Sequence, residues 1–171
     1  MCALALGIGW QVSVIEGLSQ LRSLCTLCLD MNQIGAVNDG LVGCANLREL
    51  SLNNNRLTVL NGLSRCTGLQ KLSVYRNAIE RIDGLQHLRR LHSLDLGRNQ
   101  IRRAEGLDDC ECLQTLILYE NRLEALPARL SNCLLREAWF NGNQITALRW
   151  DMCELLRLLC PVGLAGTPLP L

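Results

Sequence analysis

The stretch "LQKLSVYRNAIERIDGL", residues 69–85, returns in altered form 22 residues later as "LHSLDLGRNQIRRAEGL", residues 91–107. Both follow the pattern L-x-x-L-x-L-x-x-N-x-I/L, which occurs six times with few replacements. The six copies begin in steps of 23, 22, 22, 22 and 22 residues, at Leu24, Leu47, Leu69, Leu91, Leu113 and Leu135. Their shared asparagines are Asn32, Asn55, Asn77, Asn99, Asn121 and Asn143. A fixed period of this length predicts similar units that stack around one continuous core.

Each part of the repeat has an expected structural role. Leu72 and Val74 lie two residues apart, so a short strand would bury both and turn Ser73 to the opposite face. The amide of Asn77 can accept and donate hydrogen bonds where the chain leaves the strand, so the asparagines should stack as a ladder. Apolar residues then return every third position over residues 79–88, which suits an irregular or 3₁₀-like segment. The sequence predicts an α/β solenoid of about seven coils, with a parallel concave β-sheet and short helical, 3₁₀ or irregular convex segments.

The whole chain, residues 1–171, is predicted to form a single repeat domain. Residues 1–23 are expected to be an irregular first coil, since their apolar start lacks the basic region of a signal peptide. Six regular repeats cover residues 24–158, and residues 159–171 read as a partial last repeat without a C-terminal cap. Bare ends of a solenoid expose core and strand edges. We therefore expect either that the chain is part of a longer protein or that a partner covers its ends.

Composition and charge narrow the range of ligands. The formal net charge is +1 and 49% of the residues are hydrophobic, which favours neither nucleic acid nor an anionic membrane. The arginines at 89, 90, 102 and 103 are interspersed with acidic residues, so we do not assign them to a nucleic-acid patch. The sequence has no apolar run of eighteen residues, the length needed for a transmembrane helix. The ligand should therefore be recognised by shape, as a protein partner is.

The cysteines are predicted to be structural. Four of the ten stand where other repeats place leucine: Cys44, Cys66, Cys110 and Cys133. A free cysteine behaves as a small buried hydrophobe, so these four should lie in the core. Cys25 and Cys28 are spaced like a metal pair, but they lack a second pair and should face opposite sides of a strand. We expect no metal and no cofactor, and unpaired thiols favour a reducing compartment.

Catalysis finds little support in the sequence. His92 lies close to Ser93 and Asp95. Ser93 and Asp95 should point to the exposed face of a strand while His92 points elsewhere, so no nucleophile and base would meet. No glycine-rich phosphate loop follows a predicted strand. We expect the protein not to be an enzyme.

The concave face can be mapped from repeat positions three, five, seven and eight. Neighbouring strands of a sheet lie about 4.8 Å apart, so equivalent residues of successive coils should form rows. Aromatic and aliphatic side chains gather toward the C-terminal half of these rows, with charged residues beside them. Aromatic residues dominate the energetics of many interfaces. We predict a partner-binding face made of Tyr75, Asp95, Arg98, Ile117, Tyr119, Glu120, Glu137 and Trp139.

Within this set, Tyr75, Tyr119, Glu137 and Trp139 are expected to anchor a protein partner. Asp95, Arg98 and Glu120 are expected to set its orientation. The alternative is a solvated sheet on which the aromatic rings merely pack against one another.

The repeat resembles that of leucine-rich repeat proteins. Its 22-residue length, with "IERIDGL" and "VIEGL", is similar to the short intracellular class typified by the leucine-rich regulatory subunit of protein phosphatase 1. Axonemal dynein light chain 1 is a similar relative. The resemblance implies a leucine-rich repeat solenoid that binds protein partners on its concave face.

One segment makes the resemblance more specific. "LREAWFNGNQI", residues 135–145, resembles the E-x-W repeat found near the C-terminal end of both relatives, with Glu137 and Trp139 at the matching positions. The resemblance implies a regulator that docks on a phosphatase catalytic subunit, or a cytoskeletal adaptor that binds tubulin or dynein components. The implied location is the cytoplasm, the nucleus or the cilium.

Overall fold

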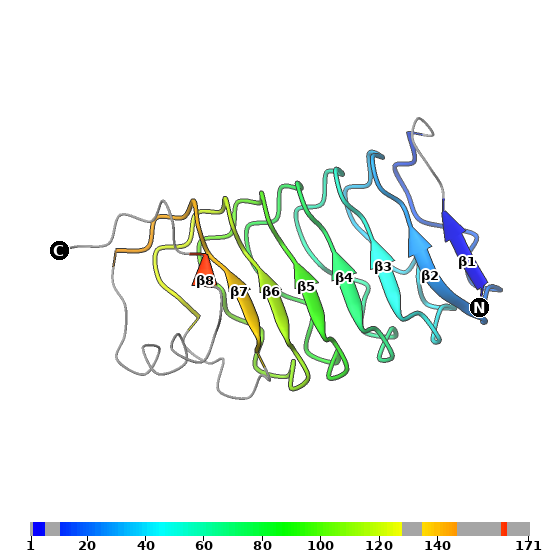
Figure 1. The fold of residues 1–171 in the computed structure, drawn as a ribbon. Helices are drawn as coiled ribbons and strands as arrows, with labels where there is room; N and C mark the ends of the chain where they lie inside the picture. The colour runs from blue at the N-terminus through cyan, green and yellow to red at the C-terminus, as the bar shows by residue number, and fades with distance from the viewer. Residues whose placement is uncertain (1, 6–10, 128–134, 147–161, 164–171) are drawn as a thin grey trace.

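The computed structural model describes residues 2–5, 11–127, 135–146 and 162–163, and each repeat in them forms one coil of a solenoid (Figure 1). The strands are β1 (Cys2–Ala5), β2 (Leu24–Cys28), β3 (Glu49–Ser51), β4 (Lys71–Ser73), β5 (Ser93–Asp95), β6 (Thr115–Ile117), β7 (Glu137–Trp139) and β8 (Val162–Gly163). They form a single eight-stranded sheet in chain order, and every neighbouring pair is parallel. The predicted solenoid with a parallel sheet is confirmed.

The strand register follows the repeat. Leu72 lies opposite Leu50 on one side and Leu94 on the other. All three are buried, while the residues that flank them in the strands are half-buried or exposed. This is the alternation expected of a strand with one face on the core. The outward residues of successive strands therefore lie in continuous rows.

The asparagines form the predicted ladder. Nδ2 of Asn77 donates to the carbonyl of Val74 at 3.0 Å and, in the preceding coil, to the carbonyl of Leu52 at 3.0 Å. Its Oδ1 accepts a hydrogen bond from the backbone N–H of Leu57, also in the preceding coil, at 2.9 Å. The same three kinds of contact recur at Asn55, Asn99, Asn121 and Asn143. Each asparagine thus joins two coils and satisfies backbone groups that would otherwise be buried without partners.

The convex side is irregular in the described residues, which contain no α- or 3₁₀-helix. The three-residue apolar spacing coincides with isolated turns, such as the hydrogen bonds from Leu88 N to the Leu85 carbonyl (2.9 Å) and from Leu91 N to the Leu88 carbonyl (3.0 Å). Gly84 has a φ of +86°, and a Cβ there would lie 2.2 Å from the Leu60 carbonyl oxygen. Only glycine therefore fits this turn.

Leucine, isoleucine and valine side chains of all the inner positions merge into one core. Cys44, Cys66 and Cys110 are fully buried in it, as predicted, whereas Cys133 lies outside the described residues. Most of the predicted last repeat, residues 159–171, also lies outside them. In the described part of the chain, no helix is long and apolar enough to cross a bilayer.

Candidate functional site

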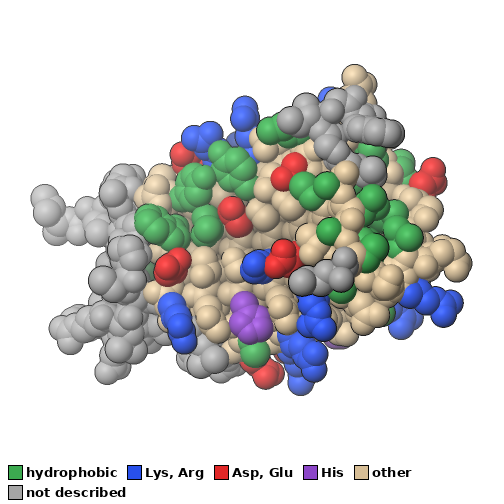
Figure 2. Space-filling model, turned by 45° about the vertical axis from the view of Figure 1, so that its right-hand side comes forward, with side chains coloured by type: hydrophobic (Ala, Val, Ile, Leu, Met, Phe, Trp, Pro, Cys, Tyr) green, Lys and Arg blue, Asp and Glu red, His purple; other side chains and the backbone are tan. Residues whose placement is uncertain are grey.

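Four of the predicted site residues lie on the outward face of the strands, and four lie in the segments that directly follow them; both together are here called the sheet face. The first four are Asp95, Ile117, Glu137 and Trp139, and the second four are Tyr75, Arg98, Tyr119 and Glu120. Asp95, Ile117 and Trp139 are opposite one another on β5, β6 and β7 and form one row with Ser51 and Ser73. Hydrophobic side chains gather on this face toward the C-terminal coils, with acidic and basic side chains beside them (Figure 2). The row order predicted from the repeat is therefore present.

Two tyrosines meet across a glycine at the seventh repeat position. The ring centroids of Tyr75 and Tyr119 are 6.2 Å apart with an interplanar angle of 38°, although one complete coil lies between them. That coil carries Gly97 at the equivalent position, and a Cβ on it would lie 2.8 Å from Cε1 of Tyr119. The missing side chain makes the room in which the two rings approach each other. Both rings remain partly exposed, so they form a preassembled aromatic surface.

Arg98 and Glu120 form an ion pair at the edge of this aromatic surface. Arg98 Nε lies 2.7 Å from Glu120 Oε2, and its NH2 donates to Oε1 at 3.2 Å. The hydrogen bond to Glu120, with the charge of that carboxylate, raises the pKa of Arg98 above its ordinary value. The guanidinium carbon is also 5.9 Å from the centroid of the Tyr75 ring. Two of the three charged residues predicted to orient a partner are therefore already bound to each other.

The backbone at these two charges is unusual. Arg98 and Glu120 have φ values of 53° and 51°, in the left-handed region that non-glycine residues seldom adopt. The eighth residue of every regular repeat shares this conformation: Met31, Asn54, Arg76, Arg98, Glu120 and Gly142. The repeat therefore fixes the direction in which the side chain at the eighth position leaves the backbone, and this direction is the same in each coil.

Asp95 lies close to the tyrosine pair on the sheet face. Burial raises the pKa of its carboxyl, while a hydrogen bond from the Gly97 N–H at 2.9 Å and the nearby Ser73 hydroxyl oppose the rise. The neighbouring ring is affected as well, since burial, followed by Tyr75 and the charge of Asp95, raises the pKa of Tyr119. Asp95 is thus held by its own coil, and it contributes negative charge close to the Tyr119 ring.

A polar network covers the N-terminal part of the sheet face. Asp30 accepts hydrogen bonds from the Ser51 hydroxyl at 2.6 Å and from the Asn53 backbone N–H at 2.7 Å. The Asn53 side-chain oxygen in turn accepts from Ser73 at 2.7 Å and from the Tyr75 backbone N–H at 2.8 Å. These residues occupy the fifth and seventh repeat positions, but the repeat does not show that their polar groups bond to one another. The network leaves this region with fewer free polar groups than its composition implies.

The E-x-W segment forms β7, at the C-terminal end of the face. Glu137 is exposed and lies opposite Thr115, and Trp139 is half-buried and lies opposite Ile117. Between them, Ala138 is fully buried. Glu137 and Trp139 therefore both belong to the outward face, as the alternation predicts.

The structure separates His92 from the acidic residue close to it in sequence. Asp95 accepts a hydrogen bond from Gly97, while Nδ1 of His92 is buried without a hydrogen-bond partner among the described residues. No nucleophile–base contact joins His92 to Ser93. In the described part of the chain, no group of three or more histidine, cysteine and acidic side chains is placed to hold a metal ion.

The buried thiols are poor nucleophiles. Burial, with a smaller contribution from Cys44, raises the pKa of the Cys66 thiol to about 11. Burial also raises the pKa of Cys44 itself. Because the thiolate is the reactive species, these two side chains are held in their unreactive form near neutral pH.

Comparisons with known proteins agree with this fold. Residues 45–87 match the family model described as "Leucine Rich repeats (2 copies)". A search of curated proteins found no match. Among solved structures, an internalin (inlF) from Listeria monocytogenes is similar, with a TM-score of 0.78 and 20% sequence identity. The similarity covers 99% of this chain and 56% of the internalin chain, so this chain spans little more than half of that protein. Residues 45–87 therefore match leucine-rich repeats, and the chain adopts the leucine-rich repeat solenoid fold.

Proposed function

We propose that this chain is a non-catalytic protein-binding module whose sheet face holds the partner. The observation that carries the proposal is the tyrosine pair, with ring centroids 6.2 Å apart and Arg98 beside it. Tyrosine and arginine are enriched among residues that dominate interface energies. Here they lie just after the strands, on backbone that is hydrogen-bonded between coils, as from Arg98 N to the Tyr119 carbonyl at 2.9 Å.

The rigidity of the face favours binding. The Arg98 side chain is already held by Glu120 at 2.7 Å, so little side-chain entropy is left to lose when a partner docks. Ordering a long side chain at an interface costs roughly 0.5–1.5 kcal/mol, and preorganisation removes part of that cost. The same ion pair offers a positive and a negative group side by side, which suits a partner with complementary charges of both signs.

For the identity of the partner, the resemblance of Glu137 and Trp139 to the E-x-W repeat supports a phosphatase catalytic subunit. On this proposal the chain is a regulator of the protein phosphatase 1 type, with Glu137 exposed for a polar contact and Trp139 beside Ile117 as an apolar one. The second candidate is an axonemal or cytoskeletal adaptor that binds tubulin or a dynein heavy chain. The same two residues support it, because the repeat resembles both families.

The test uses the purified chain with purified phosphatase 1 catalytic subunit, tubulin and dynein heavy chain, each titrated by calorimetry. Trp139→Ala and Tyr119→Ala should each weaken binding of the true partner by about thirtyfold, equivalent to about 2 kcal/mol. Val59→Ala, which changes an exposed apolar side chain away from the sheet face, is the matched control and should leave affinity unchanged. If the control loses as much affinity as the two aromatic variants, the sheet face is not the binding surface. If a partner binds every variant equally, the anchor assignment is wrong.

A further inference from the structure

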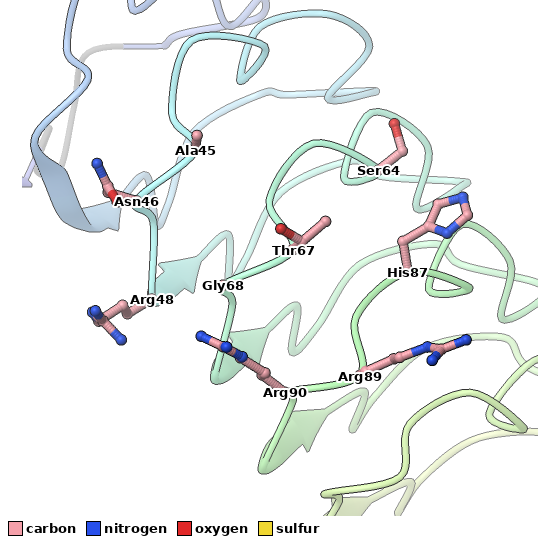
Figure 3. A pocket seen from close by; sticks show the side chains of 9 residues that line it. All are labelled: Ala45, Asn46, Arg48, Ser64, Thr67, Gly68, His87, Arg89 and Arg90. Atoms are coloured by element: carbon pink, nitrogen blue, oxygen red, sulfur yellow. The ribbon is translucent and has the colours of Figure 1, made fainter.

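A basic hollow lies on the flank of the solenoid, away from the aromatic residues. It is open to solvent, has a volume of about 770 Å³ and is lined by the segments that lead into β3, β4 and β5 (Figure 3). Its lining residues are Ala45, Asn46, Arg48, Ser64, Thr67, Gly68, His87, Arg89 and Arg90. Arginine, histidine, hydroxyl and amide groups are all present, and no acidic residue is.

The hollow exists because one coil carries smaller side chains than the next. At the position just before the first leucine of the repeat, the middle of the three coils that line the hollow has Gly68, whereas the following coil has Arg90. A Cβ on Gly68 would meet only the carbonyl oxygens of Leu47 at 3.6 Å and Ala45 at 3.7 Å. The space beside Gly68 is therefore open, and the backbone there does not require glycine. Gly68 therefore forms the floor of the hollow, between the side chains of the coil before it and the coil after it.

Two arginines border this floor without acidic partners. Arg48 and Arg90 are exposed, and neither forms an ion pair with a described residue. Arg90 extends past Gly68 toward the coil of Arg48, whereas Arg89 extends away from both (Figure 3). Arg89 instead lies 4.0 Å from Glu111 of the following coil. Arg48 and Arg90 thus have no acidic partner among the described residues, whereas Arg89, at the side of the hollow away from Gly68, lies beside Glu111.

The backbone around Arg48 is fixed. Its carbonyl accepts hydrogen bonds from the N–H groups of Gln70 at 2.8 Å and Lys71 at 2.9 Å. The side-chain nitrogen of Asn46 is used as well, because it donates to the Arg22 carbonyl at 2.8 Å. The groups left to donate hydrogen bonds to a ligand are the guanidinium groups of Arg48 and Arg90 and the hydroxyls of Ser64 and Thr67.

We propose that this hollow binds a phosphate monoester carried by a protein segment, namely a phosphorylated serine or threonine. Guanidinium groups bind phosphate oxygens in a bidentate way, and hydroxyl donors such as Thr67 can complete the shell. The volume of the open hollow, about 770 Å³, is far larger than one phosphate ion and lies in the usual range of sites for larger ligands. A peptide side chain and its neighbours would fill it. The inference is independent of the proposed sheet-face binding.

Nucleic acid fits the hollow less well. Sustained contact with a nucleic-acid backbone commonly neutralises about 6–10 phosphates. Here acidic residues stand directly beside the basic ones, since Glu49 follows Arg48 and pairs with Lys71 at 2.7 Å, and Glu111 lies beside Arg89. A single doubly charged group matches this short positive region better than a polyanion.

The test measures binding of the full chain to a fluorescent peptide mixture with a central phosphoserine between randomised neutral residues. The unphosphorylated mixture and inorganic phosphate are run in parallel, and binding is followed by anisotropy and by competition. The phosphorylated mixture should bind at least tenfold more tightly, and Arg48→Gln or Arg90→Gln should each weaken it by about tenfold. Gly68→Glu, which puts a carboxylate on the floor, should abolish binding.

Matched controls separate this site from general charge effects. Arg102→Gln and Arg103→Gln remove the same charge outside the hollow and should change affinity less than threefold. Trp139→Ala should have no effect, so that failure of the sheet-face proposal and failure of this one remain distinct. Equal binding of the two peptide mixtures, equal losses in all four arginine variants, or binding of phosphate alone without preference for the peptide would each overturn the proposal.

Discussion

Replacing Asn99 by leucine should be one of the most damaging single substitutions in this protein. The side chain is 7% exposed, and Oδ1 accepts the backbone N–H of Ile79 at 3.0 Å. Nδ2 donates to the carbonyls of Leu96 at 2.9 Å and Val74 at 3.1 Å. Leucine has nearly the same size and shape, so Asn99→Leu removes these bonds without opening a large cavity.

The expected loss follows from the groups left behind. A stranded buried N–H at Ile79 costs about 1–3 kcal/mol, and each lost donor contributes about 1 kcal/mol net. The free energy of unfolding should therefore fall by about 3–5 kcal/mol. Asn61→Leu is the matched control, because Asn61 is exposed and hydrogen-bonds only to exposed Asn38 across one coil. That change should cost less than about 1 kcal/mol.

Urea unfolding followed by circular dichroism measures both variants against the parent chain. The midpoint should shift strongly for Asn99→Leu and slightly for Asn61→Leu, with little change in slope. A loss below about 1 kcal/mol in Asn99→Leu, or equal losses in the two variants, would refute the argument that the ladder stabilises the stack.

Three further predictions follow from the geometry. Gly84→Ala should lower the free energy of unfolding by more than about 1 kcal/mol in urea titrations, because of the positive φ and the close carbonyl, and an unchanged midpoint would contradict this. The free energy of unfolding should fall as pH rises from about 9 to about 11, because the unfolded chain ionises Cys66 first, and Cys66→Ala should lack that part of the fall when the same titration is repeated. Gly97→Ala should displace the Tyr119 ring and alter the near-ultraviolet circular dichroism of the tyrosines, with a stability loss of about 1 kcal/mol or less; an unaltered spectrum would show that the glycine is not needed.

The solenoid could be predicted because its determinants are local and repeated. Leu72 and Val74 indicate the buried strand face, and Asn77 indicates the turn that follows, in a register that varies by one residue over the six repeats. The same periodicity identified Cys66 as a leucine substitute, which its full burial confirms. The choice between helical and irregular convex segments could not be made in advance, since a spacing of three is compatible with both.

The details of the candidate site depend on side-chain contacts that a repeat alignment does not contain. The rows placed Tyr75 and Tyr119 on one face, but their approach depends on the empty space above Gly97. The alignment also could not tell that Arg98 would be bound to Glu120. A glycine between two aromatic residues at one repeat position is the signal that would have found the pair. Gly68 occupies the position that Arg90 has in the next coil, and this change from arginine to glycine is the signal that would have found the basic hollow.

The asparagine ladder joins each coil to the one before it, and this gives the molecule a simple response to mechanical force. Because the bonds of Asn99 reach the preceding coil and no further, a pull on the ends can detach one terminal coil while the coils beyond its neighbour stay intact. Each released 22-residue coil adds about 75 Å of extended chain, at about 3.4 Å per residue. The protein should therefore lengthen in even steps under tension, as a series of equal extensible links.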